Sequence, residues 1–150
     1  MFLKIKIPPP IIVIFLISAV YFSSNLTIGF DLPFKKTLSL LLLFIGLLII
    51  FIPVFQFIKS KTTINPQSFK NVNNLVSSGI FKISRNPMYL GMLIIISSTV
   101  VYYFNYFSIF APFIFYFWIN EFQIKREEKK LEEKFGSDYM KYKSQTRRWI

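Results

Sequence analysis

Three long stretches without a charged residue constrain the fold of this chain more than any other feature. They run from Ile7 to Phe30, from Thr37 to Ile58 and from Asn86 to Asn120. An apolar run of about 20 residues is long enough to cross a bilayer as a helix. Hydrophobic residues make up 53% of the 150-residue chain, and a soluble domain of this size has no core large enough to cover so much apolar surface. The sequence therefore predicts an all-α, polytopic membrane protein that forms a single domain over residues 1–150.

The third stretch predicts a helical hairpin. Its 35 residues would form one helix about 50 Å long, whereas the hydrocarbon core of a bilayer is about 30 Å thick. Two short helices that turn at Asn105 fit better, because the aromatic residues around Asn105 favour the membrane interface. A single tilted helix is the alternative. The predicted spans are therefore four, at about 10–29, 37–58, 87–103 and 107–124.

The basic residues predict which side of the membrane each segment occupies. Of the 18 Lys and Arg residues, 16 lie before the first span, between the second and third, or after the fourth. The positive-inside rule places these segments in the cytoplasm, so we expect both termini there. The net charge of +11 then reflects topology and attraction to anionic lipid. The lipid bilayer is the expected partner, and nucleic acid is not, because no basic-aromatic binding module is visible.

Cysteine and histidine are both absent from the chain. Their absence excludes disulfides, thiol nucleophiles and Cys-based metal sites, and it removes imidazole as a base or as a ligand for zinc or haem. Ser-His-Asp and Cys-His catalysis are excluded for the same reason, and we expect no metal. Any chemistry must therefore use carboxylates, Tyr, Arg, Lys, Asn and backbone groups, or a reactive cofactor.

A first cluster of distinctive residues lies where the basic loop enters the third stretch, in the sequence Arg-Asn-Pro-Met-Tyr-Leu-Gly of residues 85–91. Pro87 suits the first turn of a helix, where its missing N–H is not needed. Gly91 permits close approach of another backbone. A purely structural interpretation is also open, in which Arg85 extends to the headgroups and Tyr89 anchors the interface.

A second cluster follows the predicted hairpin, so the two clusters would meet on one side of the membrane. It begins with the adjacent carboxylates Glu127 and Glu128. The apolar residues after them recur at helical spacing and predict a cytoplasmic amphipathic helix, whose face is formed by Leu131, Phe135, Tyr139 and Tyr142. Gly136 suits a left-handed helix end, and Ser137 is a candidate cap for a final short helix. A helix that merely lies on the membrane surface is the alternative.

Taken together, these motifs resemble those of integral membrane methyltransferases related to isoprenylcysteine carboxyl methyltransferase and to phospholipid methyltransferases. The resemblance covers roughly residues 65–150, with cofactor motifs in 77–91 and 121–150. It rests on Ser-Gly-Ile-Phe at 78–81, residues 85–91, Glu-Glu-Lys-Lys-Leu at 127–131, Phe-Gly-Ser-Asp-Tyr-Met-Lys-Tyr at 135–142 and Arg-Arg-Trp at 147–149. Two positions depart from the family pattern, since Asn86 replaces a His and Phe81 replaces a Tyr.

The resemblance implies S-adenosylmethionine as the cofactor and a lipophilic methyl acceptor as the substrate. Either glutamate of the pair can accept from the cofactor's amino group or ribose hydroxyls, and an arginine can hold its carboxylate. The residues implied as catalytic are Arg85, Asn86 and Tyr89. The residues implied as cofactor-binding are Gly79, Arg85, Asn86, Pro87, Tyr89, Gly91, Glu127, Glu128, Tyr139, Tyr142 and Arg148.

The departure at Asn86 bears on the acceptor. Asn can form hydrogen bonds as neutral His does, but it cannot carry a proton. An isoprenylcysteine-like carboxylate would need no base. A phospholipid amine or a small thiol would have to arrive deprotonated or be helped by a Glu or Tyr. All three acceptors stay open at this point.

Two other function classes are weighed against methyl transfer. Membrane reductases of the sterol-reductase type share an Arg-x-Pro-x-Tyr-x-Gly segment and would bind a reduced nicotinamide cofactor such as NADPH. A non-enzymatic small membrane subunit is the third class. The Glu-Glu and Phe-Gly-x-x-Tyr-x-x-Tyr motifs favour the methyltransferase, as does the short chain.

Overall fold

The computed structural model describes residues 7–26, 28–29, 31–59 and 75–150. Within these ranges the chain is helical, and its only β-type pairing is an isolated bridge between Gly29 and Asn105. The all-α prediction is therefore confirmed for the described residues. Most of the predicted loop between the second and third spans, residues 60–74, lies outside them.

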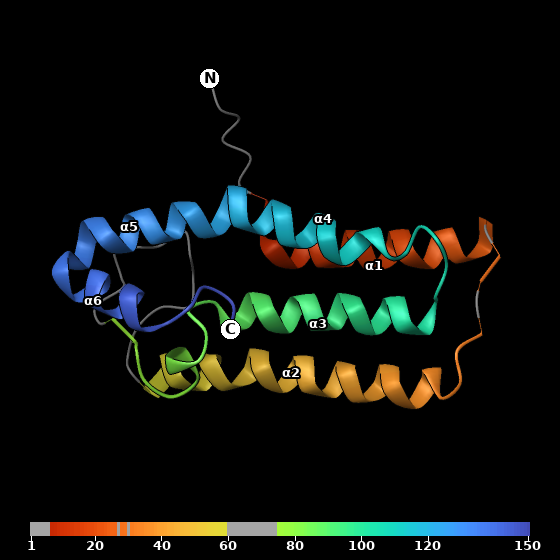
Figure 1. The fold of residues 1–150 in the computed structure, drawn as a ribbon, viewed down its shortest axis with the longest axis horizontal. Coiled ribbons are helices and arrows are strands. Elements are labelled where there is room, and N and C mark those ends of the chain that lie inside the picture. Colours follow the sequence, from red (N-terminus) through yellow and green to blue (C-terminus); the bar gives the residue numbers. More distant parts are fainter. Residues whose placement is uncertain (1–6, 27, 30, 60–74) are drawn as a thin grey trace, which may run out of the picture.

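Four helices lie side by side, as Figure 1 shows: α1 (Pro9–Leu26), α2 (Lys35–Lys59), α3 (Pro87–Tyr102) and α4 (Phe110–Ile119). Among the described helices, α1 and α2 are long and apolar enough to cross a membrane, and α3 is a shorter apolar helix. Helix α4 continues through one π-helical turn, η3 (Asn120–Ile124), into α5 (Lys125–Phe135). Two candidate spans are thus shown, and the count of four remains a prediction.

The third uncharged stretch forms two helices, as predicted, and Asn105 makes the turn between them. Its side-chain oxygen accepts the backbone N–H groups of Phe107 and Ser108, both at 3.0 Å. Its amide nitrogen donates to the carbonyl of Tyr103 at 2.9 Å and to the hydroxyl of Ser23 at 3.2 Å. Asn105 is completely buried, so its hydrogen bonds replace those that water would otherwise make.

Helices α2 and α3 form the most extensive contact between elements. Two glycines allow it. A Cβ on Gly91 would lie 2.7 Å from the carbonyl oxygen of Gly46, and a Cβ on Gly46 would lie 2.9 Å from the carbonyl oxygen of Gly91. Small residues let helix backbones approach closely where lipid surrounds them. Any larger residue at either position would push α2 away from α3.

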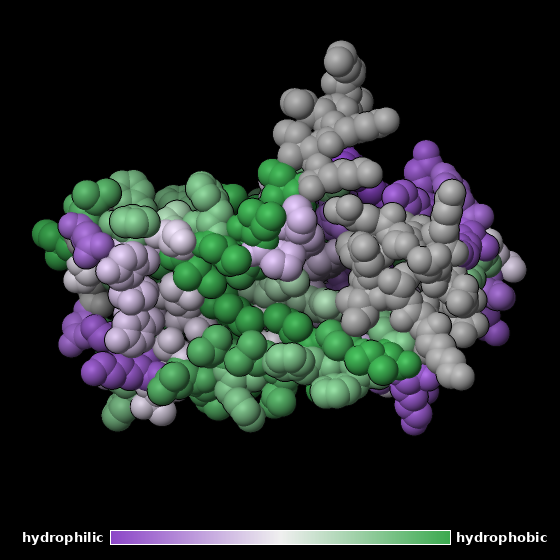
Figure 2. All heavy atoms as spheres, turned by 180° about the vertical axis from the view of Figure 1, so that it is seen from behind, coloured by the Kyte–Doolittle hydropathy of each residue, from purple (hydrophilic) through white to green (hydrophobic). Residues whose placement is uncertain are grey.

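The opposite face of α2 has no partner within the described chain and carries large apolar side chains. Those exposed are Leu40, Leu41, Phe44, Leu48, Phe51 and Phe55. Figure 2 shows a broad hydrophobic area across the middle of one face of the molecule, with hydrophilic side chains gathered toward its ends. An apolar surface of this extent is typical of a protein that lies in lipid.

The two ends of the bundle differ in what they hold. The turn end contains Asn105 and the α1–α2 connection. The motif end contains the start of α3, the 3₁₀ turn η2 (Gly79–Lys82), α5, α6 (Ser137–Gln145) and the residues after α6 (Figure 1). Both sequence motifs of the predicted site therefore lie at one end of the molecule.

The predicted C-terminal amphipathic helix is two helices. Gly136 separates α5 from α6 with φ 51° and ψ −120°. The positive φ explains the glycine, but the ψ lies outside the left-handed helical region, so the expected left-handed end is only partly matched. Gly136 is the N-cap residue of α6 and Ser137 is its first residue, so the predicted cap at Ser137 is wrong. The apolar residues still meet, because the chain folds back at Gly136. They pack with η2 in one cluster that includes Phe81, Leu131, Phe135, Tyr139 and Tyr142.

Candidate active site

Arg85 joins the two motifs through its guanidinium group. Its Nη2 atom lies 2.8 Å from Oε1 of Glu128, and the two side chains are only 10% and 9% exposed. Its Nη1 atom donates to the backbone carbonyls of Lys143, at 3.1 Å, and Thr146. Its Nε atom is buried and has no acceptor among the described residues. A buried donor without a partner is unusual in a native protein, and this atom is the one donor atom of the Arg85 guanidinium group for which the described chain offers no acceptor.

Glu128 is held by a second arginine. Arg148 donates from Nε to Oε1 at 3.0 Å and from Nη2 to Oε2 at 2.7 Å, which is the paired geometry of a strong arginine–carboxylate interaction. Burial alone would raise the pKa of Glu128, but hydrogen bonds and ion pairs with Arg148 and Arg85 outweigh burial and hold the pKa below its ordinary value. Glu128 is therefore an anion at neutral pH.

Glu127 has different surroundings. Its Oε1 atom accepts the hydroxyl of Tyr89 at 2.7 Å and the side-chain amide of Gln123. Its Oε2 atom accepts no hydrogen bond from any described residue, and it is not among the buried atoms that lack a partner. Burial raises the pKa of Glu127 to about 7, and the hydrogen bonds from Tyr89 and Gln123 oppose that rise. This carboxyl group therefore changes charge near neutral pH.

Gln123 was not predicted from the sequence. It lies four residues before Glu127 on the continuous helix, a spacing that puts two side chains on one face. That spacing is the signal that would have revealed it. Gln123 belongs to the π-helical turn η3, and single π-helical turns are frequent at functional sites. The sequence gives no comparable signal for the π-helical turn itself.

The residues after α6, numbers 146–149, form a strap across the start of α3. The backbone N–H of Arg85 donates to the carbonyl of Arg147 at 3.0 Å. The side-chain amide of Asn86 donates to the carbonyl of Arg148 at 3.0 Å. The side chain of Asn86 therefore points toward the strap and binds its backbone at Arg148.

The indole of Trp149 fastens the strap to the end of α4. Its Nε1 atom donates to Oδ1 of Asn120 at 3.3 Å. Its ring stacks on that of Tyr116, with the centroids 5.1 Å apart. The strap therefore connects α3, α5 and the α4–η3 junction at one place.

The predicted glycines lie elsewhere at the motif end. Gly79 has a φ of +61°, and a Cβ there would lie 1.7 Å from Nε2 of Gln56 in α2. Gly91 lies against Gly46 of the same helix. Pro87 is buried in the first turn of α3. Both glycines are therefore explained by close contact with α2. These contacts fix the positions of η2 and α3, which carry the motif residues, relative to α2.

The two predicted tyrosines of α6 form the wall beside η2. Tyr142 donates its hydroxyl to the carbonyl of Phe81 at 2.7 Å. Tyr139 is 2% exposed, and burial raises its pKa to about 12. Both phenols are therefore neutral at physiological pH, and they hold η2 against α6.

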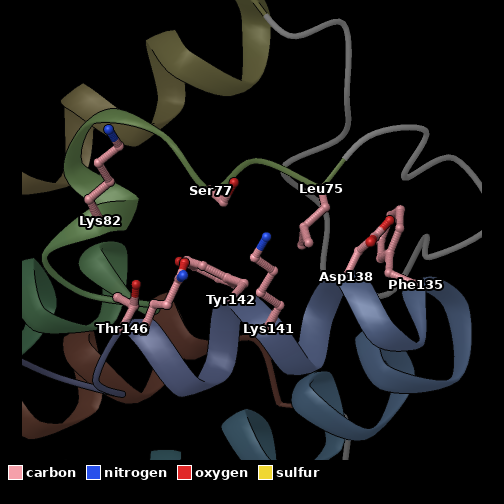
Figure 3. A pocket seen from close by; sticks show the side chains of 9 residues that line it. Leu75, Ser77, Lys82, Phe135, Asp138, Lys141, Tyr142 and Thr146 are labelled. Carbon is pink, nitrogen blue, oxygen red and sulfur yellow. The ribbon is translucent and has the colours of Figure 1, made fainter.

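A cavity of about 790 Å³ opens beside this wall. It lies between α6 and the segment that leads into η2, and Figure 3 shows side chains from both elements directed into it. All of its lining residues except Leu75 fall within the predicted cofactor motifs at 77–91 and 121–150, but Glu127, Glu128 and Arg85 are not among them. Thr146, whose carbonyl accepts from Arg85, also lines it. The lining residues are Leu75, Ser77, Lys82, Phe135, Asp138, Lys141, Tyr142, Gln145 and Thr146.

Comparison with known proteins gives a family match over most of the chain. The model of a family described as phospholipid methyltransferase matches residues 34–138. A protein from Haemophilus influenzae, described only as uncharacterized, is 43% identical over 63 residues, which cover 42% of this chain and the whole of that protein. No solved structure matches. The matched region includes both glutamates, Arg85 and Tyr89, and it ends before the strap.

Proposed function

The chain belongs to the phospholipid methyltransferase family, and from that premise we propose that it transfers a methyl group from S-adenosylmethionine to a lipophilic acceptor at the membrane surface. The family indicates a membrane methyltransferase, and the apolar helices agree with a place in the bilayer. The observation that carries the proposal is the meeting of Arg85, Tyr89, Glu127, Glu128 and Arg148 at one end of the bundle.

The residues of this cluster fit the amino-acid end of the cofactor. That end carries a carboxylate and an ammonium group. The unpartnered Nε of Arg85 is a donor for the carboxylate. Oε2 of Glu128 accepts only one hydrogen bond within the described chain, and a carboxylate oxygen has about two acceptor positions. Glu128 can therefore accept the ammonium group while it keeps both arginines.

The adenosine end needs more room than this cluster offers. Cavities for small ligands usually measure roughly 300–1,000 Å³, and the cavity beside Tyr142 has about 790 Å³. Its aromatic and polar lining suits a nucleoside. We propose that the cofactor uses this cavity and the Arg85–Glu128 cluster together, with η2 and α6 as its walls.

The protein's contribution to the reaction is mainly orientation. The sulfonium group of the cofactor supplies the methyl cation equivalent when the cofactor is bound. Arg85 fixes the cluster, Asn86 holds the strap that carries Arg148, and Tyr89 fixes Glu127. Placing two reactants in line accounts for a large part of the rate in such transfers. We propose these three residues as the catalytic set on that basis.

The membrane orientation is part of the proposal. With four spans and both termini in the cytoplasm, the motif end faces the cytoplasmic leaflet, whose anionic lipids attract the basic tail. Reporter tags placed at the two termini should both report the cytoplasm. A C-terminal tag on the opposite side would contradict the four-span topology.

Binding of S-adenosylhomocysteine to the detergent-solubilised protein tests the function. We expect saturable binding that Arg85→Met weakens and that Lys36→Met, a change at the turn end, leaves unaltered. NADPH binding in its place would favour a membrane reductase. Binding of neither compound would favour a non-enzymatic subunit.

A further inference from the structure

The cavity beside α6 carries two lysines whose charge is not balanced. Lys82 ends η2 and Lys141 lies in the middle of α6, and both line the cavity. Neither lies within ion-pair distance of a carboxylate among the described residues. The acidic residue of the lining is Asp138, and Figure 3 shows it beside Phe135, on the side of the cavity away from Lys82. The side of the cavity that holds Lys82 therefore has a surplus of positive charge.

The lining between the two lysines suits an anion with several oxygen atoms. Ser77 contributes a hydroxyl group and Gln145 contributes an amide, and both can donate hydrogen bonds. Figure 3 shows Lys141 directed into the cavity from α6. Lysine binds phosphate groups as a compact positive charge. Two ammonium groups, a hydroxyl and an amide are therefore a set of donors that a phosphate ester can use.

The cavity lies at the depth of lipid headgroups, because one of its walls packs against the end of a candidate membrane span. In η2, Gly79 lies directly against Gln56 of α2. The ring of Phe81 lies 5.2 Å from that of Phe57, also in α2. Both α2 residues belong to the last turn of that helix, which is long and apolar enough to cross a membrane. Charged and amphipathic residues at such helix ends lie at the membrane–water interface, so η2 and its lysine are level with lipid phosphates.

Each lysine has a large apolar neighbour that is exposed. Ile83 follows Lys82 and is 64% exposed, and Met140 precedes Lys141 and is 47% exposed. Basic residues combined with exposed apolar residues are typical of surfaces that bind a bilayer, since the charge meets the phosphates while the apolar group enters the acyl boundary. A small soluble phosphate compound offers nothing for these apolar side chains to contact. The phosphate of a lipid therefore explains more of this surface than a free phosphate does.

We propose that this cavity docks the phosphodiester headgroup of an anionic phospholipid, which binds beside the cofactor and is not itself methylated. The inference goes beyond the proposed function and does not depend on it. A cavity of roughly 300 Å³ already holds a small ligand, so about 790 Å³ leaves room for a headgroup next to a nucleoside. The bound lipid ties η2 and α6, the two walls of the cavity, to the membrane surface.

The test measures how many molecules of phosphatidylglycerol the full chain retains, and how tightly, by native mass spectrometry of the detergent-solubilised protein. This lipid carries a phosphodiester and hydroxyl groups but no amine, carboxylate or thiol, so it is not one of the methyl acceptors considered above. The variants are Lys82→Gln and Lys141→Gln. The matched control is Lys129→Gln, which removes the same charge from α5, where Lys129 is exposed, lies 4.0 Å from Glu133 and does not line this cavity. Phosphatidylcholine, inorganic phosphate and glycerol phosphate are the competing ligands.

We expect the wild type to retain phosphatidylglycerol in preference to phosphatidylcholine. Each of the two cavity substitutions should weaken retention by about fivefold, and the double variant by about 25-fold, from the usual contribution of a lysine at an anionic surface. Lys129→Gln should remain close to the wild type, and Lys82→Arg should keep most of the binding. The thermal midpoint should not change, because both cavity lysines are exposed and form no ion pair within the described chain.

Four outcomes decide the inference. If Lys129→Gln weakens retention as much as the cavity variants do, the binding is a general attraction of the basic surface and the inference is wrong. If inorganic phosphate or glycerol phosphate binds as tightly as the lipid, the cavity takes a soluble phosphate and the inference is wrong. If saturating S-adenosylhomocysteine displaces the lipid, the two ligands need the same space and the inference is also wrong. If the wild type retains the lipid through these lysines but binds no S-adenosylhomocysteine, the inference stands and the proposed function fails.

Discussion

Helix α3 has a polar cluster at each end, and the two clusters are built in opposite ways. At the turn end, Asn105 is neutral and bonds mostly to residues two or three positions away. At the motif end, Arg85 and Glu128 are charged, and their side-chain bonds join residues 20 to 61 positions apart. Among the described residues, the buried side-chain atoms without a hydrogen-bond partner are Nε of Arg85 and Oε1 of Gln56, both at the motif end.

This difference separates a structural cluster from a functional one. Local neutral hydrogen bonds are enough to satisfy a buried turn. Buried charges are expensive unless they are paired well, and pairs assembled from distant segments are weak evidence for a role in stability. A charged cluster with open atoms at a membrane surface is more simply explained by a ligand. Changes at the two ends should therefore affect stability and binding in different proportions.

The largest effect should come from Arg85→Met. The change leaves the buried carboxylate of Glu128 with only Arg148, and it removes the donor for two backbone carbonyls. Breaking a buried ion pair costs about 3–5 kcal/mol. We expect a loss of that size in unfolding free energy, together with loss of S-adenosylhomocysteine binding. Thermal unfolding and binding measured in the same detergent would show both.

The control for Arg85→Met is Lys125→Met. Lys125 pairs with Glu121 at the exposed surface of the same helical segment, and exposed pairs contribute roughly 0.2–1 kcal/mol. If the two substitutions destabilised the protein equally, the contrast between a buried and a solvated ion pair would be wrong.

A second effect should appear at the turn end in Asn105→Ala. The backbone N–H groups of Phe107 and Ser108 would lose their acceptor, and a buried group left unsatisfied costs about 1–3 kcal/mol. Stability should fall, while binding of S-adenosylhomocysteine per folded molecule should not change. Asn25→Ala, at an exposed Asn of α1, is the control. Weakened binding in Asn105→Ala would show that the two ends are coupled.

A smaller effect is expected at Asn86. Asn86→Leu removes the hydrogen bond to the carbonyl of Arg148, which is worth about 0.5–1.5 kcal/mol. We expect binding and methyl transfer to weaken by several-fold as the strap loosens. Asn86→His restores a donor and should recover most activity, with no pH dependence from residue 86 itself. Full activity in Asn86→Leu would reduce Asn86 to a residue that only begins α3.

A further prediction concerns how the stability of the protein depends on pH. The folded protein raises the pKa of Glu127 from 4.5 to about 7, so its contribution is complete below about pH 4.5 and is lost as pH rises through about 7. The pKa of Glu128 is lowered, so its contribution is present above its ordinary value and is lost on acidification below it. The thermal midpoint of the wild type should therefore fall as the pH rises from about 5 to 8, and Glu127→Gln should show a smaller fall. If the variant showed the same fall as the wild type, another group would be responsible for it.

The same contrast explains what the sequence could predict. The turn at Asn105 follows from the length of the uncharged stretch and from local chemistry, and the structure confirms it. The meeting of the two motifs follows from the hairpin. Gly79 and Gly91 show what local chemistry misses, because their contacts with Gln56 and Gly46 depend on where α2 lies. The sequence also could not predict that Glu128, and not Glu127, binds the arginines. That choice depends on the π-helical turn and on the strap, and neither produces a periodic pattern in the sequence.

The strap supplies Arg148 to the cluster, and Arg148 lies 20 residues after Glu128 and 62 residues after Asn86 in the sequence. Arg85, Glu128 and Arg148 are synthesised in that order. The second arginine and the indole that binds Asn120 arrive afterwards. The cluster can therefore be complete only after the strap has been made. A product truncated before residue 147 would keep α1 to α4 but lack Arg148 and Trp149, and we expect it to bind S-adenosylhomocysteine weakly or not at all.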